Sequence, residues 1–359
     1  MRLTERHPYL FEPHHADVEA RAQDWAAARI EVNTGPTPPS IPDRVRALGD
    51  AGLLRVGLAR EDVRAVALVR FQLAYHDALD DLAFIIQELA GWPMATGGAE
   101  AEVVEAARDG RAVVCFALTE PEAGSDVRGI ATRATCVGDT WRLTGTKCWV
   151  SNACDADHAI VFARADEGIG AFLVAHPPTR PQRVAGHSIG RLELDDTPAT
   201  RLTARGLPLA LGALERCRPT VGAAAMGLAR RGLDETVRHV STRRQFGAPL
   251  AALPVVRDRV ARMALDLEQG LLATLHACWR RDTAPREVRT GYESAVGKCA
   301  ATEAAQRVLD AAVQLHGARG VDEDGLVQKL WRDARPLTIY EGATDVLHTV
   351  IATRWLGDP

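Results

Sequence analysis

Apolar residues recur three and four positions apart over much of the first hundred residues, which is the spacing of one buried helix face. Three segments show this pattern: 16–32, 42–58 and 63–91, the last of which is long and largely apolar. The segment "NTGPTPPS" at 33–40 is rich in turn residues and separates the first two helices. Residues 1–112 are therefore predicted to form a helical N-terminal domain.

From about residue 113 the helical period gives way to short runs rich in β-branched and aromatic residues. These runs lie at 112–118, 131–138, 140–150, 158–164 and 170–176. Turn sequences such as "VGDT" and "DEGIG" separate them. Residues 113–206 are therefore expected to form a compact β-domain.

Long helical patterns return in the last part of the chain, at 207–241, 253–281, 286–316 and 343–356. Glycine in "QLHGARG" ends the third of them, as is typical of a helix C-terminus. Residues 207–359 thus predict a helical bundle. The whole chain is predicted to be an α+β multidomain protein, with helices before and after a small β-domain, and this order alone indicates no function.

Composition and charge exclude several classes of protein. The 359 residues include 43 basic and 47 acidic side chains that are mixed throughout, with a formal net charge of −4, so there is no basic stripe for nucleic acid. No apolar run has the length of a membrane span, and the N-terminus lacks the apolar core of a signal peptide. Seven cysteines without a CxxC pair favour reduced thiols over disulfides or a zinc site. We expect a cytoplasmic protein without a bound metal.

Two motifs in the β-region are candidate parts of a binding site. The loop "FALTEPEAGSDVRG" at 116–129 follows a predicted strand, and its turn near Gly124 presents backbone N–H groups that suit a phosphate. An ordinary β-turn is the simpler interpretation of these residues alone. In "LTGTKCWVSNA" at 143–153, Trp149 and Ser151 are two positions apart on a strand and so share a face. They suit the wall of a flat cofactor such as a flavin, although a tryptophan in a β-core is more common.

Charged residues in the helical bundle leave further alternatives open. The paired arginines of "STRRQFGAPL" at 241–250 can cap a helix end or clamp a phosphate. Arg218 in "ERCRP" stands near a helix start, where a solvated charge is the usual explanation. Glu341 in "IYEGATDV" is a candidate general base, because a carboxylate tuned by burial can remove a proton. Alternatively, it is a surface glutamate at a helix start or a structural partner of Arg332 and Arg335.

Taken together and in this order, the segments resemble the acyl-CoA dehydrogenase family. The motifs "LTEPEAGSD", "GTKCWVSNA", "RRQFGAPL", "QLHGARG" and "RDARPLTIYEG" match its signature segments over roughly residues 40–357. The resemblance implies a helical N-terminal domain, a central small β-barrel or sandwich domain and a C-terminal four-helix bundle. It also implies FAD held between the last two domains and across a subunit contact of a homo-oligomer, either a dimer or a tetramer.

The resemblance implies FAD-dependent α,β-dehydrogenation of an acyl thioester. Glu341 stands where most members have the base that removes the α-proton, while hydride passes from the β-carbon to flavin N5. The residues implied to bind FAD are Phe116, Leu118, Thr119, Gly124, Ser125, Trp149, Ser151, Arg243, Gln245, Phe246, Gln314 and Gly317. The last five are implied to reach the FAD of a neighbouring subunit. The residues implied to lie near the thioester are Ser125, Glu215 and Arg218.

The chain departs from the family's pattern at three cofactor positions. Ala318 replaces a common glycine, Ala343 replaces a threonine that usually touches the cofactor, and Pro254 stands where many members have a glutamine. The N-terminal domain and the end of the β-domain are also shortened. These differences leave open how tightly FAD is bound.

Several functional alternatives follow from the resemblance. Shortened members often act in specialised biosynthesis, so the substrate is either acyl-CoA or an acyl group on a carrier protein, of unspecified length and branching. The electron acceptor is an electron-transfer flavoprotein or oxygen. A flavin-dependent oxidase or monooxygenase on the same fold is a second function, and retention of Glu341 argues against it. A degenerate assembly subunit without catalysis is a third, and the changed cofactor positions are consistent with it.

Overall fold

The computed structural model of the chain describes residues 2–34, 37–58, 62–184, 187–285 and 288–357. The chain forms two compact units. The first consists of Met1–Ile30, Asp62–Asp81 and Arg218–Pro359, and the second of Glu31–Glu61 and Leu82–Cys217. The N-terminal helices are therefore divided between the two units. The division into 1–112, 113–206 and 207–359 stays a prediction.

Helices dominate the N-terminal part of the chain, as predicted. They are α1 (Leu3–Arg6), η1 (Pro8–Leu10), α2 (Pro13–Ala28), α3 (Ile30–Asn33), α4 (Ile41–Asp50), α5 (Arg55–Leu58), α6 (Val63–His76), α7 (Ala78–Gly97) and α8 (Ala101–Arg108). The break expected at 33–40 is present in its described part, because α3 ends at Asn33 and α4 begins at Ile41. Residues 35–36 lie outside the described residues.

The stretch at 63–91, expected to be one long helical segment, is interrupted at Asp77. This residue has an extended backbone, with φ −154° and ψ 121°, and it separates α6 from α7. Its Oδ1 atom accepts a hydrogen bond of 3.1 Å from the N–H of Leu79, so the side chain satisfies a backbone donor at the start of α7. An aspartate that can cap a new helix competes with continuation of the old one.

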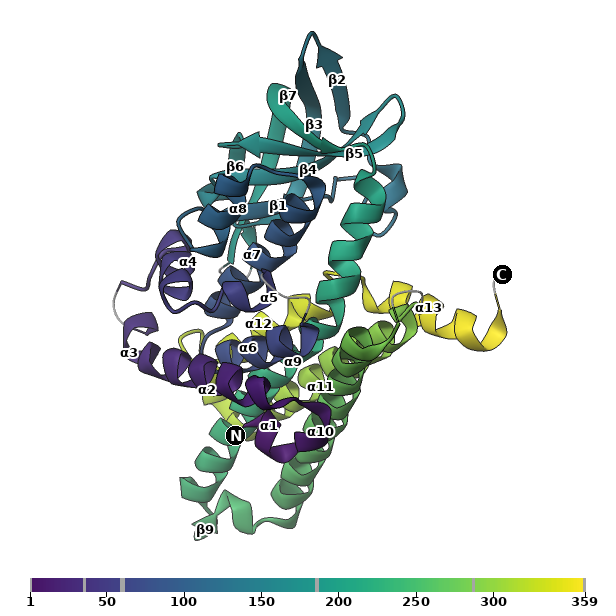
Figure 1. Cartoon of the computed structure of the whole chain (residues 1–359). Helices are drawn as coiled ribbons and strands as arrows, with labels where there is room; N and C mark the ends of the chain where they lie inside the picture. The colour runs from purple at the N-terminus through teal and green to yellow at the C-terminus, as the bar shows by residue number, and fades with distance from the viewer. Residues whose placement is uncertain (1, 35–36, 59–61, 185–186, 286–287, 358–359) are drawn as a thin grey trace. The chain divides into compact units, whose positions relative to one another are not determined.

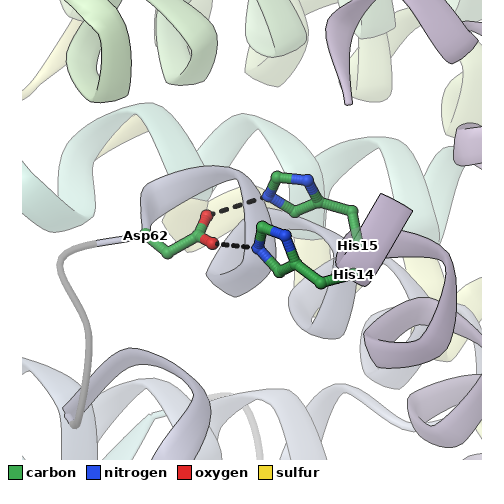
Figure 2. A group of neighbouring side chains, drawn as sticks. All are labelled: His14, His15 and Asp62. Atoms are coloured by element: carbon green, nitrogen blue, oxygen red, sulfur yellow. Dashed lines mark hydrogen bonds and ion pairs between the residues drawn. The ribbon is translucent and has the colours of Figure 1, made fainter. Parts of the chain in front are cut away.

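Two histidines connect the start of α2 to the start of α6 (Figure 2). Nε2 of His14 lies 2.8 Å from Oδ2 of Asp62, and Nε2 of His15 lies 3.0 Å from Oδ1. The same carboxylate caps α6, because it accepts a 2.9 Å hydrogen bond from the N–H of Ala65. The N–H of Glu12 donates to Nδ1 of His15, which leaves the ring proton on Nε2. His15 thus donates to Asp62 through the nitrogen that a metal ion would need, and the three side chains form a hydrogen-bonded cap.

Asp62→Asn is expected to lower stability at neutral pH. Burial alone would raise the pKa of Asp62, but hydrogen bonds from His15, His14 and Ala65 bring it below the ordinary value. A carboxyl with a lowered pKa contributes stability above about pH 4, and this contribution is lost as the pH falls further. Thermal midpoints between pH 3 and pH 7 should therefore show the gap to wild type narrowing on acidification. If added Zn²⁺ raises the thermal midpoint of wild type but not that of Asp62→Asn, the three side chains bind a metal ion, and their assignment as a hydrogen-bonded cap is wrong.

The β-domain is built from β1 (Val114–Ala117), β2 (Arg133–Val137), β3 (Thr140–Ser151), β4 (His158–Ala165), β5 (Gly168–Ala175), β6 (Thr179–Val184) and β7 (His187–Thr203). The short turns η2 (Val127–Gly129) and η3 (Ala153–Asp155) lie between strands. β4 pairs with β1 and β2 in parallel and with β5 in antiparallel orientation. β2 pairs with β3, β3 with β7, and β7 with β5, so these strands close into a small barrel (Figure 1). The predicted β-barrel is confirmed.

The strands β6 and β7 were not individually predicted. β7 carries Asp195, Asp196 and Pro198, which are poor strand residues. It nevertheless forms a strand because it pairs with three others, β3, β5 and β6. Partners that lie far away in the sequence therefore override its local preference.

Helices return after the barrel and confirm the predicted bundle. They are α9 (Gly206–Thr242), η4 (Leu250–Ala252), α10 (Pro254–Thr283), α11 (Gly291–His316), η5 (Gly317–Gly320), α12 (Leu326–Ala334), η6 (Arg335–Thr338) and α13 (Thr344–Leu356), with the hairpin strands β8 (Arg244–Gln245) and β9 (Ala248–Pro249) after α9. α10 packs along α11, and α13 packs against α11 (Figure 1). The core of the first unit joins α6, α9, α10 and α11 through buried alanine, leucine and valine side chains.

Two details of this part differ from the prediction. α11 begins at Gly291 instead of 286, and residues 286–287 lie outside the described residues. α12 was not predicted, because its nine residues are too few for a clear period, although Val327, Leu330 and Ala334 form its buried face. Within the described ranges, no helix combines the length and apolar character needed to cross a membrane.

Candidate functional site

Glu341 lies in the short connection between η6 and α13, and the backbone there is unusual. Glu341 has a left-handed φ of 54°, which is uncommon for a residue with a side chain, and Gly342 has φ of 109°. A Cβ atom on Gly342 would lie 3.0 Å from Cδ2 of Leu347 and 3.5 Å from Nε of Arg218. Glycine is therefore required after Glu341 both for its backbone conformation and for the close approach of these side chains.

The carboxyl group of Glu341 has the properties of a general base. Its Oε2 atom is buried and has no hydrogen-bond partner among the described residues. Burial raises the pKa of Glu341, the cationic side chains of Arg70, Lys298 and Arg218 oppose this, and Asp81 raises it further. The resulting pKa is higher than that of an ordinary glutamate. A carboxylate with a raised pKa and an unused oxygen can take a proton from a bound substrate.

The structural alternatives for Glu341 are wrong. Arg335 donates to Oγ1 of Thr338, and Nε of Arg332 is buried without a hydrogen-bond partner within the described ranges. Neither arginine forms an ion pair with Glu341 there. Glu341 also stands outside the first turn of α13, which begins at Thr344. It is therefore neither a structural partner of these arginines nor a glutamate that stabilises a helix start.

A buried ion pair lies within the same unit and influences Glu341. Arg70 on α6 donates from Nε to Oδ1 of Asp81 at 2.8 Å and from Nη2 to Oδ2 at 2.9 Å. Its Nη1 donates to Oγ1 of Thr220 at 3.1 Å. The charges of Arg70 and Asp81 act on both Glu341 and Tyr340. This pair was not predicted from the sequence, although charged residues inside two largely apolar helices are a usable signal.

Two cationic side chains bind two consecutive backbone carbonyls, those of Glu341 and Gly342. Nε of Arg218 on α9 donates to the carbonyl of Glu341 at 2.9 Å. Nζ of Lys298 on α11 donates to the carbonyl of Gly342. Arg218 was predicted to lie near the thioester, and in this structure it binds the backbone carbonyl of Glu341; its contact with substrate stays a prediction. Glu215, another of the three residues predicted to lie near the thioester, is exposed on the second unit.

A buried ion pair also fixes the predicted cofactor loop of the second unit. Nζ of Lys147 on β3 donates to Oε1 of Glu120 at 2.8 Å and to the carbonyl of Leu118 at 2.9 Å. Glu120 accepts further bonds from the N–H groups of Thr132 and Ala131. Burial lowers the pKa of Lys147 to about 8, although Glu120 opposes this. This pair was not predicted from the sequence, and it links the segments 116–129 and 143–153.

The loop at 116–129, which was predicted to bind the cofactor, is exposed to solvent at Gly124 and Ser125. Glu120 and Ala123 exchange backbone hydrogen bonds and close a tight turn. Of the predicted cofactor residues before and after this turn, Leu118 is buried, Phe116 and Thr119 are half-buried, and Gly124 and Ser125 are exposed. A Cβ atom added to Gly124 would meet nothing within 4 Å. The space beside this loop is therefore available to a ligand.

Trp149 is 59% exposed, so its assignment to a β-core is wrong. The pairing of β3 with β7 moves from Lys147–Leu192 to Val150–Gly190, which leaves one extra residue and places a bulge here. Trp149 has a left-handed φ of 57°, and its N–H donates to Oε1 of Gln182 at 2.9 Å. The bulge directs a large apolar ring toward solvent, and a flat cofactor is a suitable partner for it.

The hairpin after α9 exposes a second aromatic ring. Phe246 and Gly247 both have positive φ, 51° and 80°, which is the type I′ turn that joins two short strands. Phe246 is 92% exposed at its tip. The guanidinium of Arg244 donates to the carbonyl of Gly247 at 2.6 Å, and the side chain of Gln245 donates to the carbonyl of Arg244. The turn holds Phe246 away from its own unit, where another molecule can cover it.

The C-terminal ends of α9 and α11 meet through stacked histidines. The rings of His239 and His316 are 4.4 Å apart, with an angle of 20° between their planes. Burial and then the neighbours His316, Arg319 and Arg243 lower the pKa of His239. Because these neighbours all disfavour a further positive charge, this end of the bundle is cationic and suits a phosphate.

The predicted partner-binding residues gather at this cationic end. Arg243, Gln245, Phe246, Gln314 and Gly317 are all exposed, and they lie at or just after the ends of α9 and α11. No hydrogen bond of the Arg243 guanidinium occurs among the residues that the structure describes, while its backbone N–H and carbonyl bond to His239 and Leu250. The structure therefore brings together side chains that the sequence places about 70 residues apart.

Comparison with known families identifies most of the chain. The sequence model for the acyl-CoA dehydrogenase middle domain matches residues 115–204, and that for the acyl-CoA dehydrogenase C-terminal domain matches residues 204–356. A probable acyl-CoA dehydrogenase of Mycobacterium tuberculosis is 30% identical over 362 residues, which cover 95% of this chain and 90% of that protein. The human mitochondrial short-chain specific acyl-CoA dehydrogenase is 35% identical over 261 residues, 68% of this chain and 63% of that relative.

Solved structures agree with the sequence relatives. Glutaryl-CoA dehydrogenase from Mycobacterium smegmatis superposes with a TM-score of 0.89 at 25% identity, covering 97% of this chain and 96% of that one. A structure of a glutaryl-CoA dehydrogenase from the same organism contains FADH2. Butyryl-CoA dehydrogenase from Megasphaera elsdenii superposes with a TM-score of 0.86 at 25% identity, covering 96% and 99%.

Proposed function

The chain belongs to the acyl-CoA dehydrogenase family, and from this premise we propose that Glu341 is the base that removes the α-proton of an acyl thioester. The protein is an FAD-dependent oxidoreductase of this family. The observation that carries the role of Glu341 is its buried, unpartnered Oε2 atom on a left-handed backbone. A structural glutamate would have satisfied that oxygen, because an unpaired buried polar atom is costly.

The residues around Glu341 perform separate parts of the reaction. Glu341 takes the α-proton, and its raised pKa makes it a stronger base than an exposed glutamate. Arg218 and Lys298 hold the peptide that carries it, so that the carboxyl group keeps one position. Arg70 compensates the charge of Asp81, which would otherwise disfavour ionisation of the base. FAD, when bound, supplies the acceptor for the hydride that leaves the β-carbon, and the loss of both hydrogens leaves an α,β-unsaturated thioester.

Two groups of exposed residues fit FAD. Trp149 and the open loop at Gly124 and Ser125 offer an aromatic face beside unoccupied space for a ring system. Arg243 and the cationic end of α9 and α11 offer positive charge for a pyrophosphate. We infer that the second group serves the FAD of a partner subunit, because the exposed Phe246 needs a covering surface. The protein would then be a homo-oligomer whose cofactor site is complete only in the assembly.

The changed positions of the family pattern have structural explanations in part. Pro254 is the first residue of α10, where the fixed φ of proline suits a helix start. Ala343 is the residue before α13 and provides no side-chain cap. Ala318 lies exposed in η5. Each of these residues suits its place in the local fold, so the three changes alone do not favour an assembly subunit over the enzyme.

The substrate, the electron acceptor and the location are further parts of the proposal. The substrate is an acyl-CoA or the same thioester on a carrier protein, since both present a pantetheine arm. The electrons pass to an electron-transfer flavoprotein or to oxygen. The seven cysteines are all free, which supports a cytoplasmic location. Anaerobic bleaching of the flavin by a panel of acyl-CoA and acyl-carrier thioesters identifies the substrate. Absence of flavin absorbance from the purified protein would contradict its assignment as a flavin-dependent enzyme.

Arg243→Ala is expected to weaken FAD binding by roughly 1.5–3 kcal/mol, the scale of a hydrogen bond to a charged group. The reason is that its exposed guanidinium has no side-chain partner within the described ranges and would bind a phosphate oxygen. Titration of the apoprotein with FAD measures the loss. Arg262→Ala, which removes another exposed arginine that pairs with Asp258, serves as control. Equal affinity of Arg243→Ala and wild type would show that this arginine only ends its helix.

A further inference from the structure

Lys298 is an unusual residue for its place in the fold. It is fully buried on α11, on a helix face that otherwise carries small side chains such as Ala295, Ala301 and Thr302. Its Nζ atom donates to the carbonyl of Gly342. A buried ammonium group is costly unless it has a specific partner, and a methionine or leucine would fill the same volume without that cost. Its presence at this position therefore needs a reason other than packing.

The backbone that Lys298 contacts is the one that carries the base. Glu341 and Gly342 both have positive φ, and α13 begins two residues later. Arg218 binds the carbonyl of Glu341 from α9, and Lys298 binds the next carbonyl from α11. The two cations thus bind two consecutive backbone carbonyls from two different helices. A residue in the left-handed region persists only when its surroundings hold it there.

Charge links Lys298 to the carboxyl group as well as to the backbone. Burial lowers the pKa of Lys298 to about 8, while Glu341 is the first of the groups that oppose this. In return, Lys298 is one of three cations that lower the pKa of Glu341 against its burial. The others are Arg70 from α6 and Arg218 from α9, whose guanidinium groups stay charged at all working pH values. Lys298 is thus the cation of the three that can lose its charge near neutral pH.

We propose that Lys298 is a positioning residue for Glu341, which holds the base through the Gly342 carbonyl and places a positive charge near its carboxylate. This inference rests on the proposed function, because it assumes that Glu341 is the base. Lys298 would not contact the reacting atoms. Its role is to keep Glu341 in one position and to favour the ionised form that accepts a proton.

The groups that face Glu341 decide what removal of Lys298 does. Arg70 on α6, Arg218 on α9, Lys298 on α11 and Asp81 on α7 act on its charge, beside burial. Without Lys298, burial and Asp81 are opposed by the two arginines alone. The pKa of Glu341 should therefore rise, and with it the pH at which the base becomes ionised.

The first test is the pH dependence of flavin reduction by butyryl-CoA and glutaryl-CoA in anaerobic single turnovers. Lys298→Met and Lys298→Gln should move the acidic limb of the rate to higher pH. Lys298→Arg, which keeps the charge, should leave the limb near its wild-type position. Lys329→Met is the matched control, since Lys329 pairs with Asp333 on α12 and is not among the charges that mainly set the pKa of Glu341. It should lower the thermal midpoint without moving the limb.

The second test needs no substrate. Thermal midpoints of wild type, Glu341→Gln, Lys298→Met and the double variant form a cycle that measures the coupling between the two residues. Removing Lys298 should lower the midpoint more in wild type than in Glu341→Gln, because only the charged carboxylate uses the ammonium group. Additive midpoints together with an unmoved acidic limb would overturn the inference; if Lys298→Met does not fold, Lys298→Gln takes its place in both tests. Retention of the wild-type rate by Glu341→Gln would instead overturn the proposed function, and coupling in the cycle would still report on Lys298.

Discussion

Glu341→Gln is expected to keep the fold and the bound FAD but to reduce the rate of flavin bleaching by a thioester at least about 10²–10⁴-fold, the usual contribution of a general base. Glutamine has nearly the same shape, so the packing around the η6–α13 connection survives. Its amide has no basic lone pair for the α-proton. Because Oε2 of Glu341 is buried, solvent water has no direct access with which to replace it.

The same variant should be more stable than wild type at neutral pH. The pKa of Glu341 is raised in the fold by burial, so the fold prefers the protonated carboxyl. For a raised pKa, the stabilising contribution is complete below the ordinary glutamate pKa and is lost as the pH rises through the folded value. Glutamine does not ionise, so the variant does not lose this stability as the pH rises. The thermal midpoint of Glu341→Gln should exceed that of wild type at pH 8, and the difference should shrink below about pH 4.5.

Measurement of both quantities on one sample separates a base from a structural residue. A structural glutamate predicts a lowered midpoint and an unchanged rate, which is the reverse of our expectation. Glu323→Gln, which removes one exposed carboxylate of the same unit, controls for the change in net charge. It should change neither the midpoint nor the rate appreciably.

Much of the architecture follows from the sequence because its signals are local. The period of the apolar residues predicts α9 and α10 to within two residues at either end. The strand β7 and the break at Asp77 depend on other factors. β7 exists because three other strands pair with it, and Asp77 ends α6 because its side chain bonds to the next helix. Neither the strand β7 nor the break at Asp77 can be predicted from the pattern of hydrophobic residues.

The candidate site divides in the same way. Glu341, Trp149 and Arg243 could be proposed as site residues from the sequence, because each lies inside a short recognisable motif. Lys298 and Arg70 act on Glu341 through contacts that span many residues: 44 positions separate Lys298 from Gly342. Their only local sign is a charge inside an apolar helix, which can also mark a solvated edge. Supporting residues of this kind become visible only when the chain is folded.

Arg70→Met is expected to destabilise the protein by about 3–5 kcal/mol, the usual effect of removing one partner from a buried ion pair. Arg70 and Asp81 are 0% and 5% exposed, and two hydrogen bonds of 2.8 and 2.9 Å join them. Removal of the guanidinium leaves the carboxylate of Asp81 buried without its bidentate partner. Urea unfolding at neutral pH measures the loss of free energy.

The double variant Arg70→Met/Asp81→Leu should recover most of that stability, because two apolar side chains replace both charges. The effect on catalysis should follow the same order. Arg70 lowers the pKa of Glu341 and Asp81 raises it, so Arg70→Met alone should move the acidic limb of flavin reduction to higher pH, and the double variant should move it less. If the single variant is as stable as wild type, the pair contributes nothing to the fold. If the double variant is less stable than the single one, the carboxylate of Asp81 has a role of its own, and the account of Arg70 as its compensating charge is wrong.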